Sequence, residues 1–124
     1  MSIIRPNRGW IGVDLDGTIA KYEGWKGHTH IGEPVPAMVA LVRQLIAEGW
    51  EVRIFTARMS GDEDEAAEVM HAVQEWTRRH VGRALKATCI KDYAMVRLYD
   101  DRAVQVEPNT GRLIEDPVCG AELS

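Results

Sequence analysis

The stretch VDLDGT, residues 13–18, places Asp14 and Asp16 two positions apart, directly after the apolar run 10–13. Two carboxylates this close repel each other, and burial raises the pKa of either one, so the arrangement is unfavourable unless a cation or a transferring proton compensates. Such perturbed groups are typical of sites that do chemistry. The stretch therefore predicts a site where carboxylates act together with a cation or a proton.

Side chains that can take part in catalysis also follow the later apolar runs of the chain. Thr56 and Arg58 come after EVRIF, Lys91 comes after ATCI, and Asp100 and Asp101 come after VRLY. A carboxylate can attack phosphorus, a second carboxylate can exchange protons with the leaving group, and a hydroxyl and an ammonium can hold phosphoryl oxygens. A hard cation can neutralise the acidic residues. This combination predicts phosphoryl chemistry.

The apolar pattern predicts the strands and helices that must position these residues. Five strands are expected, over 9–13, 51–56, 87–90, 96–99 and 103–107, and the last of them leads into a turn over 108–111. One helix is expected to begin at 34–36, where proline suits the first turn, and to end at Gly49. A second helix is expected to follow the loop and N-cap at 60–62.

This alternation of strands and helices is typical of α/β proteins. We expect a Rossmann-like three-layer α/β/α sandwich, in which a mainly parallel sheet carries helices on both faces. In such sheets ligands bind beyond the carboxyl ends of the strands. The candidate residues follow the ends of four predicted strands, so we expect them to meet at this edge.

Two groups of residues are interpreted as structural. The acidic run 62–65 lies in the first turn of the second predicted helix, where negative charge favours the helix dipole, and we expect it to be solvated. Trp10, Trp50 and Trp76 are expected to be core or interface residues. Trp25 is the exception, because its segment should border the site.

Composition limits the class of protein. The 124 residues predict a single domain, 1–124, and 45% hydrophobic with 27% charged residues is ordinary for a globular protein. The net charge of −4 and a pI near 5.5 give no basic surface for nonspecific nucleic-acid binding. Cys89 and Cys119 fit neither a disulfide framework nor a zinc finger, and no apolar run reaches the length of a membrane span. A cytoplasmic location with no membrane partner is the expectation.

Four segments together resemble the motifs of a known family. DLDGT (14–18), RIFTAR (53–58), Lys91 and RLYDDRAV (97–104), in that order, closely resemble the four motifs of the haloacid dehalogenase-like (HAD) hydrolases. The resemblance spans about residues 10–107. It implies a HAD-like hydrolase core with phosphatase activity.

The resemblance also implies a role for each matching residue. Asp14 would be the nucleophile that forms an aspartyl-phosphate, and Asp16 would be the general acid and then the general base. Asp14 and Asp100 would bind Mg²⁺ through their side chains, and Asp16 would bind it through its backbone carbonyl. Thr56 would hydrogen-bond the transferring phosphoryl group, and Lys91 would neutralise that group and Asp14. An acid two residues after the nucleophile favours ester hydrolysis.

Several assignments stay open. Tyr99 stands where many members have glycine, in a variant similar to small members that include phage-encoded ones, so either Asp100 or Asp101 is the direct metal ligand. Lys86 is an alternative to Lys91, although it precedes the predicted strand. Gly17 would permit a sharp turn, and Thr18 would orient Asp16.

The segment 19–33 between the first motif and the first helix is too short for a cap domain. We therefore expect a capless, open site. Either a partner subunit of a homo-oligomer covers it, or the substrate is large enough to exclude water itself, or the specificity is loose. This segment, called the flap below, contains an unusual set of side chains: Tyr22, Trp25, Lys26, His28 and His30. They either grip a substrate, by stacking on a base or sugar, or form an ordinary surface loop.

The two histidines of the flap and Arg58 each have more than one possible role. His28 and His30 lack a nearby third ligand, so we do not interpret them as a metal pair. Arg58 either contacts a substrate phosphate or forms a salt bridge with the acidic start of the second helix.

The leading functional hypothesis is a magnesium-dependent phosphatase that hydrolyses phosphomonoesters through an aspartyl-phosphate. The substrate would be a nucleotide, a sugar phosphate or a nucleic-acid end. One alternative is a receiver-like phosphoacceptor domain, but a receiver would place adjacent acids first and its phosphoacceptor later, which is the reverse of this order. The other alternative is a catalytically silent binding or regulatory protein of the HAD fold.

Overall fold

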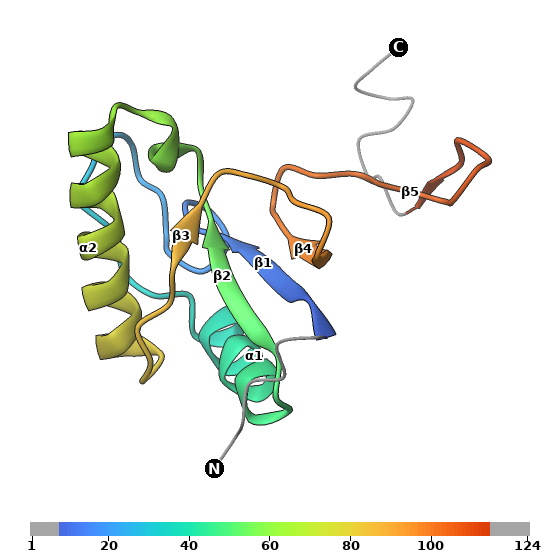
Figure 1. Ribbon diagram of the computed structural model, residues 1–124, viewed down its shortest axis with the longest axis horizontal. Helices are drawn as coiled ribbons and strands as arrows, with labels where there is room; N and C mark the ends of the chain where they lie inside the picture. The colour runs from blue at the N-terminus through green and yellow to red at the C-terminus, as the bar shows by residue number, and fades with distance from the viewer. Residues whose placement is uncertain (1–7, 115–124) are drawn as a thin grey trace.

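A four-stranded parallel sheet forms the centre of the computed structural model, which describes residues 8–114 (Figure 1). The strands are β1 (Trp10–Asp14), β2 (Glu51–Phe55), β3 (Ala87–Thr88) and β4 (Met95–Tyr99), and their spatial order is β3-β2-β1-β4. All three neighbouring pairs are parallel. The predicted parallel α/β architecture and its first four strands are therefore confirmed, although β3 is shorter than predicted.

Helix α1 (Pro36–Ala47) begins and ends where the sequence predicts. Pro36 occupies its first position, where a missing N–H costs no intrahelical hydrogen bond, and Val35 before it is extended. Gly49, with φ of 92°, takes the left-handed conformation just after the helix, which suits glycine. The chain then enters β2.

The second helix, α2 (Glu63–His80), follows a 3₁₀ turn, η2 (Ala57–Ser60). The Asp62 side chain caps the helix by accepting a hydrogen bond from the Glu65 N–H at 2.8 Å. The acidic first turn is exposed, as predicted, and complements the positive end of the helix dipole.

Both helices pack against one face of the sheet. Ile11 and Val13 alternate along β1, and Val52 and Ile54 alternate along β2, so each pair points to one side. They share a buried cluster with side chains from both helices: Val39, Val42, Leu45 and Ile46 from α1, and Val69, Val73 and Trp76 from α2. Right-handed crossovers that run β1 to β2 to β3 proceed in one direction, which puts both helices on the same face.

The described residues do not confirm the predicted third layer. The connection from β3 to β4, residues 89–94, contains no helix and is shorter than the ~10 residues of an ordinary helix. On that face, Trp10 is only 1% exposed. Its indole N–H donates to Asp92 at 2.7 Å, and the Arg53 guanidinium lies 4.5 Å from a ring centroid of the indole. A tryptophan, a loop and an arginine cover part of the face that a third layer would cover.

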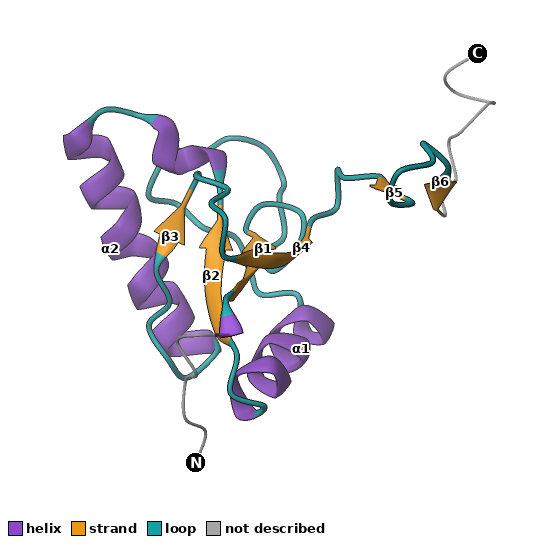
Figure 2. Ribbon diagram, turned by 45° about the vertical axis from the view of Figure 1, so that its right-hand side comes forward, coloured by secondary structure: helices purple, strands orange, loops and turns teal. Residues whose placement is uncertain are grey.

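The predicted strand over 103–107 does not belong to the main sheet. Only β5 (Gln105–Val106) forms there, and it pairs antiparallel with β6 (Leu113–Ile114) in a separate hairpin that extends away from the sheet (Figure 2). The predicted turn is present, with Asn109 and Gly111 at φ of 65° and 78°. The two residues of β5 are exposed, so no buried apolar face ties them to the sheet.

The remaining structural expectations concern the tryptophans, the cysteines and the membrane. Trp76 is buried and Trp50 packs against the core, as predicted. Cys89 is a half-buried free thiol, and Cys119 lies outside the described residues. Within residues 8–114, neither helix has the length and apolar character needed to cross a bilayer.

Ile54→Ala tests whether the core between the sheet and the two helices stabilises the fold. Ile54 is fully buried between strands and helices, so its truncation should leave a cavity and lower the free energy of unfolding by about 3 kcal/mol in urea titrations. Val104→Ala is the control, because Val104 is 45% exposed and its truncation should cost less than about 0.5 kcal/mol. Equal losses in the two variants would contradict this assignment of the core.

Candidate active site

A cleft of about 890 Å³ opens at the carboxyl edge of the sheet. Loops after β1, β2 and β4 and part of the flap form its walls. The lining residues include seven predicted site residues and five others: Asp14, Asp16, Trp25, Thr56, Arg58, Asp100 and Asp101, with Gly17, Tyr22, Phe55, Ala57 and Arg102. The parallel strands thus bring together residues that are far apart in the sequence.

Three carboxylates form the most acidic part of this cleft. Asp14, Asp100 and Asp101 each offer an oxygen, and these atoms lie within 4.8 Å of one another. Within the part of the chain that the structure describes, this is the one group of three or more acidic, histidine or cysteine side chains spaced to hold a metal ion. Clustered carboxylate oxygens are the ligands that Mg²⁺ prefers.

Thr18 orients this acidic cluster. Its hydroxyl oxygen lies 3.3 Å from an oxygen of Asp14 and 3.0 Å from an oxygen of Asp101, and it accepts a hydrogen bond from the Asp101 N–H at 3.0 Å. The prediction that Thr18 orients Asp16 is therefore wrong. The tertiary structure brings the Asp101 loop against Thr18, while Asp16 turns to another partner.

Gly17 is required by the same close approach. Its φ is 88°, and a Cβ built on it would lie 2.5 Å from a carboxylate oxygen of Asp101. Any other residue would combine an unfavourable backbone conformation with a clash. The predicted sharp turn is thus confirmed, and the glycine also leaves room for the acidic cluster.

The clustered charge perturbs the titration of Asp14. Partial burial, a hydrogen bond shared with Asp101 and repulsion from Asp100 raise the pKa of Asp14 from its ordinary value of 3.8 to about 7, although the Thr18 hydroxyl opposes the shift. A carboxylate that resists ionisation in this way is stabilised by a nearby cation. The charge of the donor set and its spacing therefore both fit a divalent metal.

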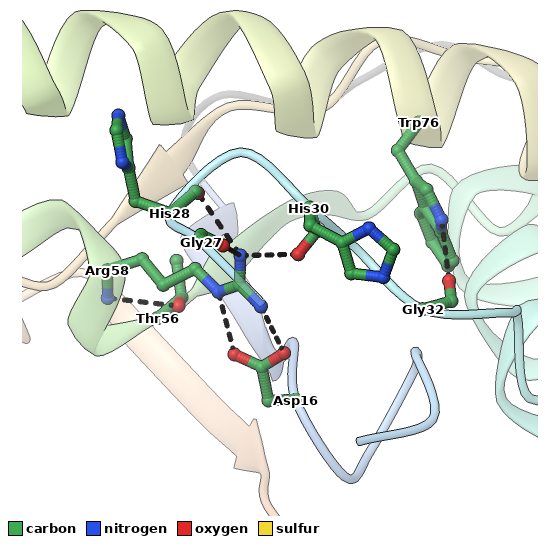
Figure 3. A network of polar contacts seen from close by, with 8 residues as sticks. All are labelled: Asp16, Gly27, His28, His30, Gly32, Thr56, Arg58 and Trp76. Carbon is green, nitrogen blue, oxygen red and sulfur yellow. Dashed lines mark hydrogen bonds and ion pairs between the residues drawn. The ribbon is translucent and has the colours of Figure 1, made fainter. Parts of the chain in front are cut away.

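Asp16 is not part of this cluster, and its side chain pairs with Arg58 (Figure 3). Arg58 Nε and Nη2 donate to the two Asp16 oxygens at 2.9 and 2.7 Å, in a bidentate geometry. The Arg58 side chain is only 7% exposed. The salt bridge of Arg58 is therefore formed with Asp16 and not with the acidic start of α2.

Arg58 also holds the flap. Its Nη1 donates to the backbone carbonyls of Gly27, His28 and His30, at 3.2, 3.1 and 2.7 Å (Figure 3). Its guanidinium carbon lies 4.9 Å from a ring centroid of Trp25. One buried cation therefore connects the predicted acid/base residue to the segment that borders the cleft.

The two ends of the flap are fixed by backbone and core contacts. Lys21 N–H donates to the Glu33 carbonyl at 2.8 Å, and the Trp76 indole N–H donates to the Gly32 carbonyl at 3.0 Å (Figure 3). A Cβ on Gly32 would lie 2.1 Å from the Lys21 carbonyl oxygen, so only glycine fits. The flap is anchored at its base and held at its tip by Arg58.

Thr56 and the lysines occupy different positions relative to the cleft. Thr56 is 3% exposed, and its hydroxyl accepts a hydrogen bond from the Arg58 N–H at 3.2 Å. Lys91 is exposed and lies outside the cleft lining, so the structure does not bring it to Asp14. The alternative, Lys86, lines a hollow with Val52 and Leu85 and is likewise not part of the cleft.

The two flap histidines have different neighbours. His28 Nε2 lies 3.4 Å from a carboxylate oxygen of Glu68 on α2, and the backbone carbonyl of His30 accepts from Arg58.

The pairing of Arg58 with Asp16 was not predicted from the sequence. The available signal was an Asp-x-Asp and a Thr-x-Arg at the ends of adjacent strands, where opposite charges can meet.

Asp14→Asn tests the electrostatics of the cluster. Because the pKa of Asp14 is raised on folding, the native state binds more protons than the unfolded state between about pH 4 and pH 7, and stability falls as pH rises through this window. In chelator at about pH 8, the variant should therefore melt a few degrees higher than wild type. Mg²⁺ should raise the melting temperature of wild type more than that of the variant. Identical pH profiles and identical Mg²⁺ responses would contradict the charge cluster.

Arg58→Lys tests the connection between Asp16 and the flap. A lysine ammonium cannot reproduce the bidentate pair and the carbonyl contacts together. Amide hydrogen exchange at His30, whose N–H donates to the Gly27 carbonyl, should accelerate about 10-fold, while exchange at Ile54 in β2 should stay unchanged. Arg102→Lys is the matched control, since Arg102 is an exposed cation on the same cleft. Unchanged exchange at His30 in Arg58→Lys would show that Arg58 does not hold the flap.

Comparison with known proteins identifies no relative of this chain. No family model matches it, and neither the curated proteins nor the solved structures give a significant match. What the chain does must therefore be inferred from the cleft itself, in which a carboxylate cluster, a buried hydroxyl and a carboxylate–guanidinium pair meet at the carboxyl edge of a parallel sheet.

Proposed function

We propose that this protein is a magnesium-dependent phosphatase that hydrolyses phosphomonoesters through an aspartyl-phosphate on Asp14, on a capless core similar to that of the HAD hydrolases. The observation that carries the proposal is the cluster of Asp14, Asp100 and Asp101 within 4.8 Å, in a cleft that also contains Asp16 and Thr56. The same residues are the ones that the motif resemblance assigns to phosphoryl transfer.

In the first step, a carboxylate oxygen of Asp14 attacks phosphorus and the bond from phosphorus to the ester oxygen breaks. The leaving oxygen takes a proton from Asp16 and departs as an alcohol. In the second step, water attacks the aspartyl-phosphate and gives a proton to Asp16. The bond from phosphorus to the Asp14 oxygen breaks, which releases inorganic phosphate and restores both aspartates.

Asp14 and either Asp100 or Asp101 would hold Mg²⁺ through their side chains, and the Asp16 carbonyl would complete the protein ligands. When bound, the ion supplies positive charge that offsets both the acidic cluster and the transferring phosphoryl group. Thr56 would donate its hydroxyl proton to a phosphoryl oxygen. In support of this role, the hydroxyl oxygen accepts from the Arg58 N–H, which leaves the hydroxyl proton available as a donor.

The Arg58–Asp16 pair has a consequence for the proton transfer. Both Asp16 oxygens accept from Arg58, so the pair must open and Asp16 must take up a proton from solvent before it can protonate the leaving oxygen. A substrate phosphate is a competing anion for the guanidinium. We infer that Arg58 exchanges Asp16 for the phosphate when substrate binds, which is how it would act as a substrate-binding residue. Lys91 would contribute only after the 89–94 loop moves toward the cleft.

Steady-state phosphate release tests the proposal. Wild type with Mg²⁺ should release phosphate repeatedly from an aryl phosphate, and excess chelator should abolish release. Asp14→Asn should lose at least about 10⁴-fold in kcat because no nucleophile remains. Asp16→Asn should lose about 10²- to 10⁴-fold, and more on substrates with poor leaving groups.

The matched control is Asp64→Asn, which removes an exposed carboxylate in the first turn of α2 and should keep full activity. Full turnover by Asp14→Asn would refute the nucleophile assignment. A single phosphoryl group accepted and retained by wild type, with no further release, would favour a receiver-like phosphoacceptor instead.

A further inference from the structure

Aromatic side chains are concentrated in the candidate active-site cleft. Only 6% of the residues of this chain are aromatic, yet Tyr22, Trp25 and Phe55 all line the cleft that contains Asp14, and Phe55 is the single phenylalanine of the sequence. Tyr22 is 51% exposed and Trp25 is 59% exposed. Large rings left this open beside a reactive centre are typical of a surface that a ligand covers.

The Trp25 ring and the flap backbone are also held in place before any ligand arrives. The buried Arg58 guanidinium packs on the Trp25 ring, and the same guanidinium fixes three carbonyls of the flap. The flap base is closed by the Lys21–Glu33 backbone hydrogen bond. Since little ordering remains to be done on binding, stacking on these rings would contribute efficiently to affinity.

The charge of the cleft limits the kind of ligand. Four carboxylates line it, from Asp14, Asp16, Asp100 and Asp101, against the two cations Arg58 and Arg102. This acidic balance disfavours a polyanion such as a nucleic-acid strand. The volume of about 890 Å³ falls within the range of roughly 300–1,000 Å³ that is typical of small-molecule sites. A small ligand with one phosphate and a planar ring matches both constraints.

We propose that the cleft binds a nucleoside monophosphate, with its base stacked on Tyr22 and Trp25 of the flap and its phosphate at Asp14. This inference rests on the proposed phosphatase function and narrows its substrate class. Bases stack on aromatic side chains through their faces whatever their hydrogen-bonding groups. The rings therefore distinguish nucleotides from phosphates that carry no base, while the choice among bases stays broad.

The test is the ratio of kcat/KM for adenosine monophosphate to kcat/KM for ribose 5-phosphate, with Mg²⁺. The two substrates share the phosphate and the sugar, so the ratio isolates the base. In wild type this ratio should be at least about 10. In Trp25→Ala or Tyr22→Ala the ratio should fall about 10-fold, as expected for the loss of one stacking contact. The fall should come mainly from a higher KM for adenosine monophosphate. Trp25→Phe should restore most of the ratio.

Tyr93→Ala is the matched control, because Tyr93 is a fully exposed aromatic on the 89–94 loop outside the cleft lining, and its ratio should equal that of wild type. A wild-type ratio near 1, or a ratio that Trp25→Ala leaves unchanged, would overturn the inference. Preference for a phosphorylated oligonucleotide over the mononucleotide by about 10-fold or more would overturn it in favour of a nucleic-acid end.

A binding measurement distinguishes failure of the phosphatase proposal from failure of the nucleotide inference. If neither an aryl phosphate nor any nucleotide is hydrolysed, the phosphatase proposal fails, and calorimetric titration of wild type and Trp25→Ala with adenosine monophosphate and with ribose 5-phosphate decides the ligand class. Tighter binding of the nucleotide that depends on Trp25 supports the nucleotide site. Equal binding of the two ligands, or no binding of either, overturns it.

Discussion

The partly buried pair between Arg58 and Asp16 connects the three segments that form the cleft. Asp16 lies in the turn after β1, Arg58 lies in η2 after β2, and the flap carbonyls complete the guanidinium's partners. A guanidinium that is 7% exposed has lost most of its hydration, so it must be compensated by ionic and carbonyl contacts. That requirement fixes the flap against the sheet edge and explains why a short segment can border the site without a cap domain.

The cleft divides its acidic residues into two environments. Partial burial, together with the neighbouring Asp101 and Asp100, raises the pKa of Asp14, while the charge of Asp16 is offset by Arg58. Carboxylates in different surroundings can take different roles in one reaction. A cation would satisfy the first environment, and a substrate phosphate would compete within the second. In the phosphatase mechanism that we propose, these two events would make Asp14 available as a nucleophile and Asp16 available for proton transfer.

The one-sided core and the cleft are consequences of the same topology. Both crossover helices bury Ile11, Val13 and Ile54 against one face, so the carboxyl ends of β1 and β2 stay rigid. The other face has Trp10 and Arg53 packed together and no helix among residues 89–94. Rigid strand ends are a suitable support for a site whose residues must be held in a defined geometry.

Much of this protein is determined locally by its sequence. Apolar periodicity predicted four parallel strands and two helices, Pro36 and Asp62 marked the helix starts, and Gly17 marked the turn, because these signals act within a few residues. Contacts between distant residues were decided only by the tertiary structure. Thr18 meets Asp101 across 83 positions and Arg58 meets Asp16 across 42, and local pattern cannot choose among the carboxylates that each could reach. The helix-free second face of the sheet within residues 8–114 and the separate β5–β6 hairpin likewise depend on which apolar faces find partners, a property of the packed chain and not of any one segment.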